Sequence, residues 1–286
     1  NTENDSLNST KMNAKMYAEV FRLLGWITSV GDGSYPLVFT YIGEHAACTD
    51  DVLPLYEQCV LGINNPQEIM AVKYDEKVRF FKAALFSLEE LDEIMYKHEL
   101  CLGPMSIDDL DTAQFNRMLV YIRGLRGSYS RYASAYKDLC ETLNVKESLP
   151  DNSTRLPIAF MKTCNWIESY RTKKLYPPKS LECIRLTEHG KEVAKSLHDV
   201  KDLRLDEYNS YPDAKKKALI RLGTYSMLLR AGYNVSPVKE TMDKDADTCK
   251  DILEGKQLLF SPYQTLHCSE AVSYTHLRAH ETLANL

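Results

Sequence analysis

One block of residues occurs twice in the chain, and it is built around the only two tryptophans. The first copy is centred on Trp26 and ends near Gly43, and the second is centred on Trp166 and ends near Gly190. In each copy a segment with helical spacing leads into Trp-Ile, a hairpin-like region follows, and Thr-x-x-Gly opens another helix. The two copies, about 140 residues apart, predict a duplicated helix–hairpin–helix unit.

The second copy gives the clearest physical pattern. Phe160, Cys164 and Ile167 recur at helical spacing and predict one apolar helix face. Trp166 stands where this helix gives way to the hairpin, and its side chain is large enough to fill that junction. Thr187 is expected to cap the next helix, because a threonine side chain can accept a hydrogen bond from a free backbone N–H of the first turn.

Helix, two-stranded wing and helix is the order of a winged-helix unit, a fold that usually docks on DNA. The chain is therefore predicted to be mainly α-helical with small β-hairpins, an α+β architecture of tandem winged-helix or helix-turn-helix DNA-binding modules. Alternative interpretations are a winged-helix transcriptional regulator, a protein-interaction module that does not bind DNA, and a pair of small folding units without a ligand.

Breaks in the pattern divide the chain into five predicted parts. These are a disordered tail over 1–10, a winged-helix and helical module over 11–127, a second winged-helix module over 128–212, a third small helix–hairpin module over 213–271, and an artefactual tail over 272–286. The last segment resembles a translated sequencing adapter.

Length and composition are those of an ordinary globular protein. The chain has 286 residues, of which 44% are hydrophobic and 26% charged, and this length allows two or three domains. No run of 18 apolar residues occurs and the polar start has no signal-peptide pattern, so a cytoplasmic protein without a membrane partner is expected. The eight cysteines form no C-x-x-C pair and are expected to be reduced, mostly buried thiols.

Charge is distributed unevenly along the chain. The net charge is −5, but residues 121–230 carry 21 Lys and Arg against 13 Asp and Glu, whereas the rest carries 14 against 27. Lysine and arginine displace the counterions that surround DNA phosphates. A basic segment within an acidic chain therefore favours double-stranded DNA as the partner of the middle region.

Basic residues near the two copies are the candidate DNA contacts. Arg155 and Lys162 lie on the helix before the second hairpin, the element that usually enters the groove. A helix N-terminus with several lysines also favours phosphate, because its N–H groups are free. The full predicted set is Lys11, Lys15, Arg126, Arg131, Arg155, Lys162, Arg171, Lys173, Lys174, Lys179, Lys215, Lys216 and Lys217.

Catalytic residues are not predicted. A metal-dependent nuclease needs two carboxylates that hold Mg²⁺ and a lysine that orients water. The nearest match is Asp251 with Glu254 and Lys256, but a separation of three residues on a helical pattern is wrong for this site, so these residues are expected to be surface charge. No catalytic residue, metal ligand or cofactor is therefore assigned to the chain.

The order of these parts resembles the DNA-recognition region of type IIS restriction endonucleases such as FokI. The resemblance rests on the Ile-x-Leu-Thr-x-x-Gly-Lys sequence of residues 184–191, on Arg-Ala-Gly at 230–232 after a long helix, and on Asp-Ile-Leu at 251–253. A predicted helix pair over 80–100 is similar to the AlwI-like group of these enzymes. The resemblance covers most of residues 11–266.

The resemblance implies an activity that lies outside this chain. In such enzymes a nuclease domain follows the recognition domains, binds Mg²⁺ and cuts outside the recognised site, with dimerisation on DNA for cleavage. Here that domain would lie beyond residue 271, where the natural sequence is expected to be interrupted. The resemblance carries no catalytic role to any residue of this chain.

Overall fold

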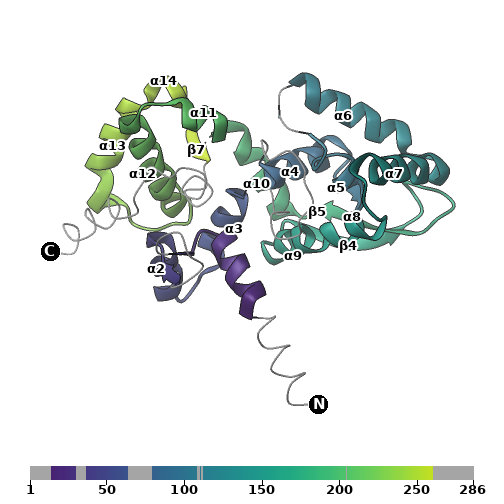
Figure 1. Cartoon of the computed structure of the whole chain (residues 1–286), viewed down its shortest axis with the longest axis horizontal. Helices are drawn as coiled ribbons and strands as arrows, with labels where there is room; N and C mark the ends of the chain where they lie inside the picture. The colour runs from purple at the N-terminus through teal and green to yellow at the C-terminus, as the bar shows by residue number, and fades with distance from the viewer. Residues whose placement is uncertain are drawn as a thin grey trace, which may run out of the picture. The chain divides into compact units, whose positions relative to one another are not determined.

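A computed structural model describes residues 14–29, 37–63, 79–107, 110, 112–203 and 205–259. The predicted tails over 1–10 and 272–286, residues 31–33 of the first hairpin-like region and Lys11 lie outside this part of the chain. The described residues are mainly helical with three small sheets, as the α+β prediction required (Figure 1). None of their helices has both the length and the apolar character needed to cross a membrane.

The chain divides into two compact units, and one is inserted into the other in sequence. Unit 1 combines Asn1–Ile63 with Val200–Leu286, and unit 2 comprises Asn64–Asp199. The predicted boundary between residues 127 and 128 is wrong, because it cuts through a sheet of unit 2. Strand β3 (Ile94–Tyr96), from the first predicted module, pairs antiparallel with β5 (Leu181–Leu186), from the second.

Unit 2 is a helical body around one three-stranded sheet. Strand β5 is central, with β3 on one side and β4 on the other, and both pairings are antiparallel. The elements in chain order are α4 (Phe80–Glu90), β3, α5 (Glu99–Leu102), α6 (Thr112–Leu125), α7 (Tyr129–Leu143), α8 (Ser148–Ser153), α9 (Arg155–Thr163), β4 (Ile167–Thr172), β5, α10 (Glu188–Ser196) and the 3₁₀ turn Leu197–Asp199.

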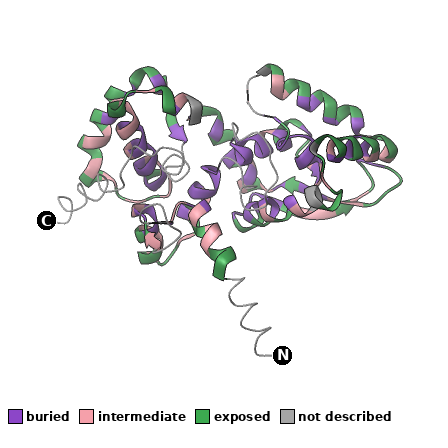
Figure 2. Ribbon diagram, in the orientation of Figure 1, coloured by how far each residue is buried: buried purple, intermediate pink, exposed green. Residues whose placement is uncertain are grey.

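The core of unit 2 is aromatic where α4 meets the second copy. Phe81 is fully buried, and its ring meets the rings of Phe160 and Trp166 edge-on, at 5.9 Å between centroids in each case. Trp166 is itself fully buried, as its predicted place at the junction requires. The buried inner faces of the helices around this cluster are drawn in purple in Figure 2.

Unit 1 has two parts that come from distant stretches of sequence. The first part has a helix over 14–23, β1 (Ile27–Ser29), β2 (Leu37–Phe39), α2 (Tyr41–Cys48) and α3 (Leu53–Leu61). The second part has β6 (Val200–Asp202), α11 (Leu205–Ser210), α12 (Asp213–Arg230), the 3₁₀ turn Ser236–Val238, α13 (Lys239–Thr248), α14 (Lys250–Leu253) and β7 (Gln257–Leu259).

Contacts between α3 and α12 join the two parts of unit 1. Arg230, at the end of α12, donates from Nε to Gln58 Oε1 on α3 at 2.7 Å and from Nη1 to the carbonyl of Leu258 at 3.0 Å. The predicted hairpin of the third module lies mostly outside the described residues, of which Leu259 is the last. Strand β7 (Gln257–Leu259) pairs in parallel with β6, which lies far away in the sequence.

The two tryptophan blocks have the same backbone hydrogen bonds. Trp26 N donates to the carbonyl of Phe21 and Trp166 N to that of Met161, both at 2.9 Å. The carbonyls of Trp26 and Trp166 then each accept from a threonine N–H at 2.9 Å. The predicted order of helix, hairpin and helix is therefore confirmed in both copies. Phe21 and Met161 are therefore equivalent positions, each five residues before its tryptophan.

The predicted cap Thr187 is confirmed, and the first copy has an equivalent cap at Thr40. Thr40 precedes α2 and accepts at Oγ1 from Gly43 N, and Thr187 precedes α10 and accepts from Gly190 N, both at 3.0 Å. This hydrogen bond satisfies one of the free N–H groups of the first turn. The backbone before each tryptophan turns through a left-handed residue, Gly25 in one copy and Asn165 in the other.

Three predicted elements differ from the structure. Ile94–Tyr96, expected in the second helix of a helix pair, is strand β3, because Asp92 and Glu93 have positive φ and turn the chain away from α4. This removes the helix pair on which the similarity to the AlwI-like group rested. Helices α8 and α11 were not predicted either, because the sequence pattern indicated a linker over 146–152 and a break over 207–212.

Candidate nucleic-acid interface

Helix α9 has one buried face and one exposed face. Pro157, Ile158, Phe160 and Met161 are buried, while Arg155, Ala159, Lys162 and Thr163 are exposed along the opposite side. No acidic residue occurs in this helix. Among the described residues, neither Arg155 nor Lys162 has an ion-pair or hydrogen-bond partner for its side chain. The outer face of α9 is therefore positively charged.

The β4–β5 hairpin that follows α9 is also basic. Its register pairs Ile167 with Leu186 and Thr172 with Leu181, so residues 173–180 form the connecting loop. The exposed basic residues on the hairpin are Arg171, Lys173, Lys174, Lys179 and Arg185. Over residues 155–181 the sequence has six Lys or Arg and a single acidic residue, Glu168, whose Oε1 accepts from Arg185 Nε at 2.6 Å.

The tip of this hairpin is packed against the body of unit 2. Leu175 and Tyr176 are buried at 6% and 1% exposure, although their neighbours Lys173 and Lys174 are exposed. The carbonyl of Leu175 accepts from Gly127 N at 2.7 Å, between α6 and α7. Two apolar residues thus anchor the loop while its lysines face solvent.

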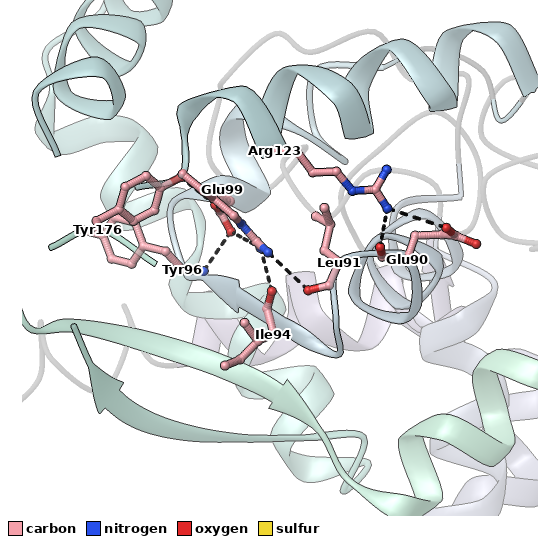
Figure 3. Close-up of polar contacts among 8 residues, drawn as sticks. Glu90, Leu91, Ile94, Tyr96, Glu99, Arg123 and Tyr176 are labelled. Carbon is pink, nitrogen blue, oxygen red and sulfur yellow. Dashed lines mark hydrogen bonds and ion pairs between the residues drawn. The ribbon is translucent and has the colours of Figure 1, made fainter. Parts of the chain in front are cut away.

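The hairpin tip is hydrogen-bonded to a buried carboxylate in the body of unit 2 (Figure 3). Glu99 on α5 is fully buried, and its Oε1 accepts from the hydroxyl of Tyr176 at 2.5 Å while Oε2 accepts from Tyr96 N at 2.9 Å. Burial, and then the charge of Glu99, raise the pKa of the Tyr176 hydroxyl far above its usual value. The hydroxyl therefore stays protonated and acts as the donor.

Arg126, one of the predicted DNA contacts, completes this network, so its guanidinium binds groups of the protein instead of facing solvent. Its Nε donates to Glu99 Oε1 at 3.0 Å and its Nη2 to Oε2 at 2.9 Å, and further N–H groups donate to the carbonyls of Leu91 and Ile94 at 3.2 and 2.6 Å. Burial lowers the pKa of Arg126, but the hydrogen bonds to Glu99 and its charge outweigh burial and raise it overall. A guanidinium used in this way binds protein rather than phosphate.

Arg131 lies close to the hairpin tip, at the start of α7. Its guanidinium donates to the carbonyls of Gly124 and Arg126 at 2.7 and 3.2 Å, beside Gly127, which binds the tip. From the hairpin side, the Lys179 ammonium lies over the ring of Tyr129, 5.5 Å from its centroid. The structure therefore brings Arg131 and Lys179, distant in the sequence, to the same end of unit 2.

In unit 1, the helix over 14–23 is the equivalent of α9. Lys15 and Arg155 stand the same number of residues before their tryptophans, and so do Arg22 and Lys162. Lys15 is exposed, whereas Arg22 pairs with Glu19 on the same helix. The first copy therefore keeps the basic positions but partly neutralises one of them.

The lysine cluster at the start of α12 is less open than predicted. Lys215 Nζ donates to Asp251 Oδ2 at 2.6 Å, and the Lys216 ammonium lies 5.9 Å from the centroid of the Tyr208 ring. Lys217 is partly exposed. Lys215 and Lys216 thus have partners within unit 1, which weakens the case for phosphate binding at this helix start.

The two carboxylates whose sequence pattern came nearest to that of a metal-dependent nuclease, Asp251 and Glu254, form ion pairs on the surface. Asp251 pairs with Lys215, and Glu254 Oε1 lies 3.5 Å from Lys201 Nζ. The hydrogen bond from Lys215 is the main cause that holds the pKa of Asp251 below its usual value. Within the described parts of the chain, no group of three or more His, Cys, Asp or Glu side chains could hold a metal ion.

Three exposed residues on the α9 side were missed by the sequence analysis. Ala159 and Thr163 continue the stripe of Arg155 and Lys162, and Asn165 is exposed just before Trp166. A search restricted to charge could not find them. Their signal is position: Ala159 and Thr163 stand four and eight residues after Arg155, on one helix face.

A cavity elsewhere in unit 2 does not involve these basic residues. It has a volume of about 460 Å³ and lies between α5, α6 and α7. Its lining includes the apolar residues Leu102, Met118 and Leu139 and two charged residues, Arg117 and Asp138. Val120 and Tyr121 follow Met118 closely in α6, and their side chains are exposed, at 67% and 46% respectively.

Comparison of the chain with protein-family models, with curated proteins and with solved structures finds no match.

Proposed function

We propose that unit 2 is a winged-helix module that binds double-stranded DNA through the outer face of α9 and the β4–β5 hairpin. The observation that carries the proposal is the run of six basic residues against one acidic residue over 155–181, the acid being paired with Arg185. A helix followed directly by a hairpin whose second strand also pairs with an earlier strand has the winged-helix order.

The two parts of this surface have different expected roles. Helix α9 presents Arg155, Ala159, Lys162 and Thr163 along one face, which combines long donors with small residues that allow close approach to bases. The hairpin presents Lys173, Lys174 and Lys179 in a loop, where flexible ammonium groups suit phosphates. Base readout is therefore assigned to α9 and phosphate binding to the hairpin.

The proposal extends to the class of the protein. We propose that this chain is the DNA-recognition region of a type IIS restriction endonuclease, as the residue pattern over 184–191 and the long helix before residues 230–232 indicate. Mg²⁺ and dimerisation would then serve a nuclease segment that is not among the described residues. Selection of a preferred sequence from random duplexes, and Mg²⁺-dependent cutting by a chain extended past residue 271, are the expected results.

The DNA-binding proposal is tested by the salt dependence of binding. Fluorescence anisotropy with a labelled duplex is measured from low to moderate salt for the native chain and for a Lys173→Ala/Lys174→Ala variant. Removing one lysine–phosphate interaction flattens the log–log slope by roughly 0.9. We expect the slope of the double variant to fall by up to about two.

A charge-matched control separates local contacts from net charge. Lys239→Ala/Lys244→Ala also removes two positive charges, but from α13, where these lysines pair with Asp243 and Glu240 on their own helix. We expect this control to keep the native slope. Equal flattening in both variants, or an unchanged slope in the hairpin variant, would count against the hairpin as the DNA-binding surface.

A protein-interaction role is the second candidate, and the exposed apolar residues of α6 favour it. Val120 and Tyr121 lie in the same helix as Met118, which lines the cavity between α6 and α7. Apolar groups that form a contiguous exposed patch are typical of protein contacts. A chain without salt-dependent DNA affinity, whose self-association or partner binding is lost on Val120→Asp, would support this candidate instead.

A further inference from the structure

The tip of the β4–β5 hairpin is held more firmly than a surface loop needs to be. Within eight loop residues, Leu175 and Tyr176 are buried while Lys173, Lys174 and Lys179 are exposed. Fixing a loop in one conformation costs conformational entropy, which a mobile surface loop would not lose. The anchor therefore fixes the direction in which the lysines project.

The anchor joins segments that are far apart in the sequence. Glu99 accepts from Tyr176 on the hairpin and from Arg126, the residue after α6. Arg126 also donates to the carbonyls of Leu91 and Ile94, in the turn and strand that precede α5. The carboxylate, the guanidinium and the phenol thus link the hairpin to the body of unit 2 through a single buried site (Figure 3).

We infer that Glu99, Arg126 and Tyr176 are positioning residues that hold the hairpin tip and so pre-organise its lysines for phosphate. This inference rests on the proposed DNA binding, which it deepens. A loop that is already ordered loses less entropy when it binds, so the same lysines bind more tightly than they would on a free loop. The three residues act through the hairpin and do not touch DNA themselves.

The amide of Gly127 gives a readout that needs no DNA. It donates to the carbonyl of Leu175, so its hydrogen exchange is slow only while the tip is docked. Tyr176→Phe removes one hydroxyl and keeps the buried ring, which preserves folding. We expect exchange at Gly127 to become about tenfold faster, and duplex affinity to fall about threefold to tenfold with a shallower salt slope.

Tyr136→Phe is the matched control. Tyr136 is also buried, and its hydroxyl donates to the carbonyl of Glu147 at 2.8 Å, a residue outside the hairpin. This variant should keep native exchange at Gly127 and native DNA affinity.

The outcomes separate this inference from the proposed function. Unchanged exchange at Gly127 in Tyr176→Phe overturns the anchor, whatever the DNA result. Faster exchange with native affinity and slope, in a chain that binds duplex, overturns the positioning role. If the native chain binds no duplex, the proposed function fails, and exchange at Gly127 still decides whether the network holds the tip.

Discussion

Gly190 lies against the carbonyl group of Trp166 so closely that a Cβ added to it would be 2.0 Å from the carbonyl oxygen. In the other copy the same relationship holds between Gly43 and Trp26, with a corresponding distance of 1.9 Å. Each glycine is the third residue of a helix capped by threonine. The Thr-x-x-Gly pattern therefore encodes both the cap and the close approach of the helix to the tryptophan.

Gly190→Ala and Gly43→Ala are expected to destabilise units 2 and 1, respectively, by about 3 kcal/mol or more, since backbone must move to admit the methyl group. Gly124→Ala in α6 is the control, because a Cβ there meets no atom within 4 Å and alanine favours a helix by roughly 0.5–1 kcal/mol. Urea unfolding followed by tryptophan fluorescence measures this. Each unit contains one tryptophan, so Trp26→Phe or Trp166→Phe backgrounds isolate the units. A neutral Gly190→Ala would contradict the packing.

Arg126→Met should destabilise unit 2 by about 3–5 kcal/mol, because it leaves the buried Glu99 carboxylate without its cation. Arg123→Met removes a similar side chain three residues earlier, from α6, but the Arg123 guanidinium lies 3.8 Å from Glu90 in an exposed pair, worth about 1 kcal/mol or less. Urea midpoints of the two variants give the comparison. Equal effects would show that the buried network adds no stability beyond that of a surface pair.

Arg155→Ala should weaken binding to a selected duplex more than to a scrambled one, by about 1–3 kcal/mol of lost discrimination. Lys195→Ala, on the exposed face of α10, is the control and should change both affinities equally or leave both unchanged. Competition anisotropy with the two duplexes measures the ratio. A uniform loss of affinity for both duplexes in Arg155→Ala would assign this arginine to phosphate instead.

The thiol groups should divide sharply by reactivity at pH 8. Burial raises the pKa of Cys59 to about 12 and the pKa values of Cys183 and Cys249 to about 11, whereas Cys48 is exposed. Because the thiolate is the reactive form, iodoacetamide should modify Cys48 first and the other three only in urea, as mass spectrometry will show. Rapid modification of Cys183 in the folded chain would contradict its burial.

The three buried thiols, Cys59, Cys183 and Cys249, make the free energy of unfolding depend on pH in the alkaline range. Their pKa is raised on folding from a usual 9.0, so the folded chain retains protons that the unfolded chain releases. Their contribution is complete below pH 9.0 and is lost as the pH rises towards 11. The urea midpoint should therefore fall across this range, and Cys183→Ala should make the fall less steep.

Asp251→Ala should leave any Mg²⁺-dependent cutting of plasmid DNA by this chain or an extended one unchanged. The Asp251 carboxylate is paired with Lys215, and among the described residues no group of three or more His, Cys, Asp or Glu side chains could hold the metal that cutting requires. Gel electrophoresis of the digests provides the measurement. Loss of discrete fragments in this variant alone would make Asp251 part of a metal site.

Local signals in the sequence predicted the parts of the fold that local forces determine. Both tryptophan blocks have the predicted order of helix, hairpin and helix, and Thr187 caps α10 as predicted. Strand β3 was missed because its three residues become a strand only by pairing with β5, which is distant in sequence. Short segments stabilised by long-range pairing have little local signature.

Only those features of the candidate interface that depend on local sequence could be predicted. The exposed positions of Arg155 and Lys162 follow from helical spacing and charge. The burial of Arg126 depends on Glu99, a carboxylate without any sequence pattern that marks it as its partner. Charge alone therefore could not separate Arg126 from Arg131, a nearby arginine whose side chain remains exposed.

The insertion of unit 2 into unit 1 affects the order in which the ribosome can deliver a foldable chain. Unit 2 is a continuous stretch, so all of its partners have been synthesised once residue 199 has emerged. Helix α3, whose Leu55, Val60 and Leu61 are almost fully buried, must wait for α12 before its apolar face has a partner. Domains generally fold as units during synthesis, so the apolar face of α3 stays exposed on the nascent chain while unit 2 forms, and exposed apolar surface of this kind is prone to aggregate.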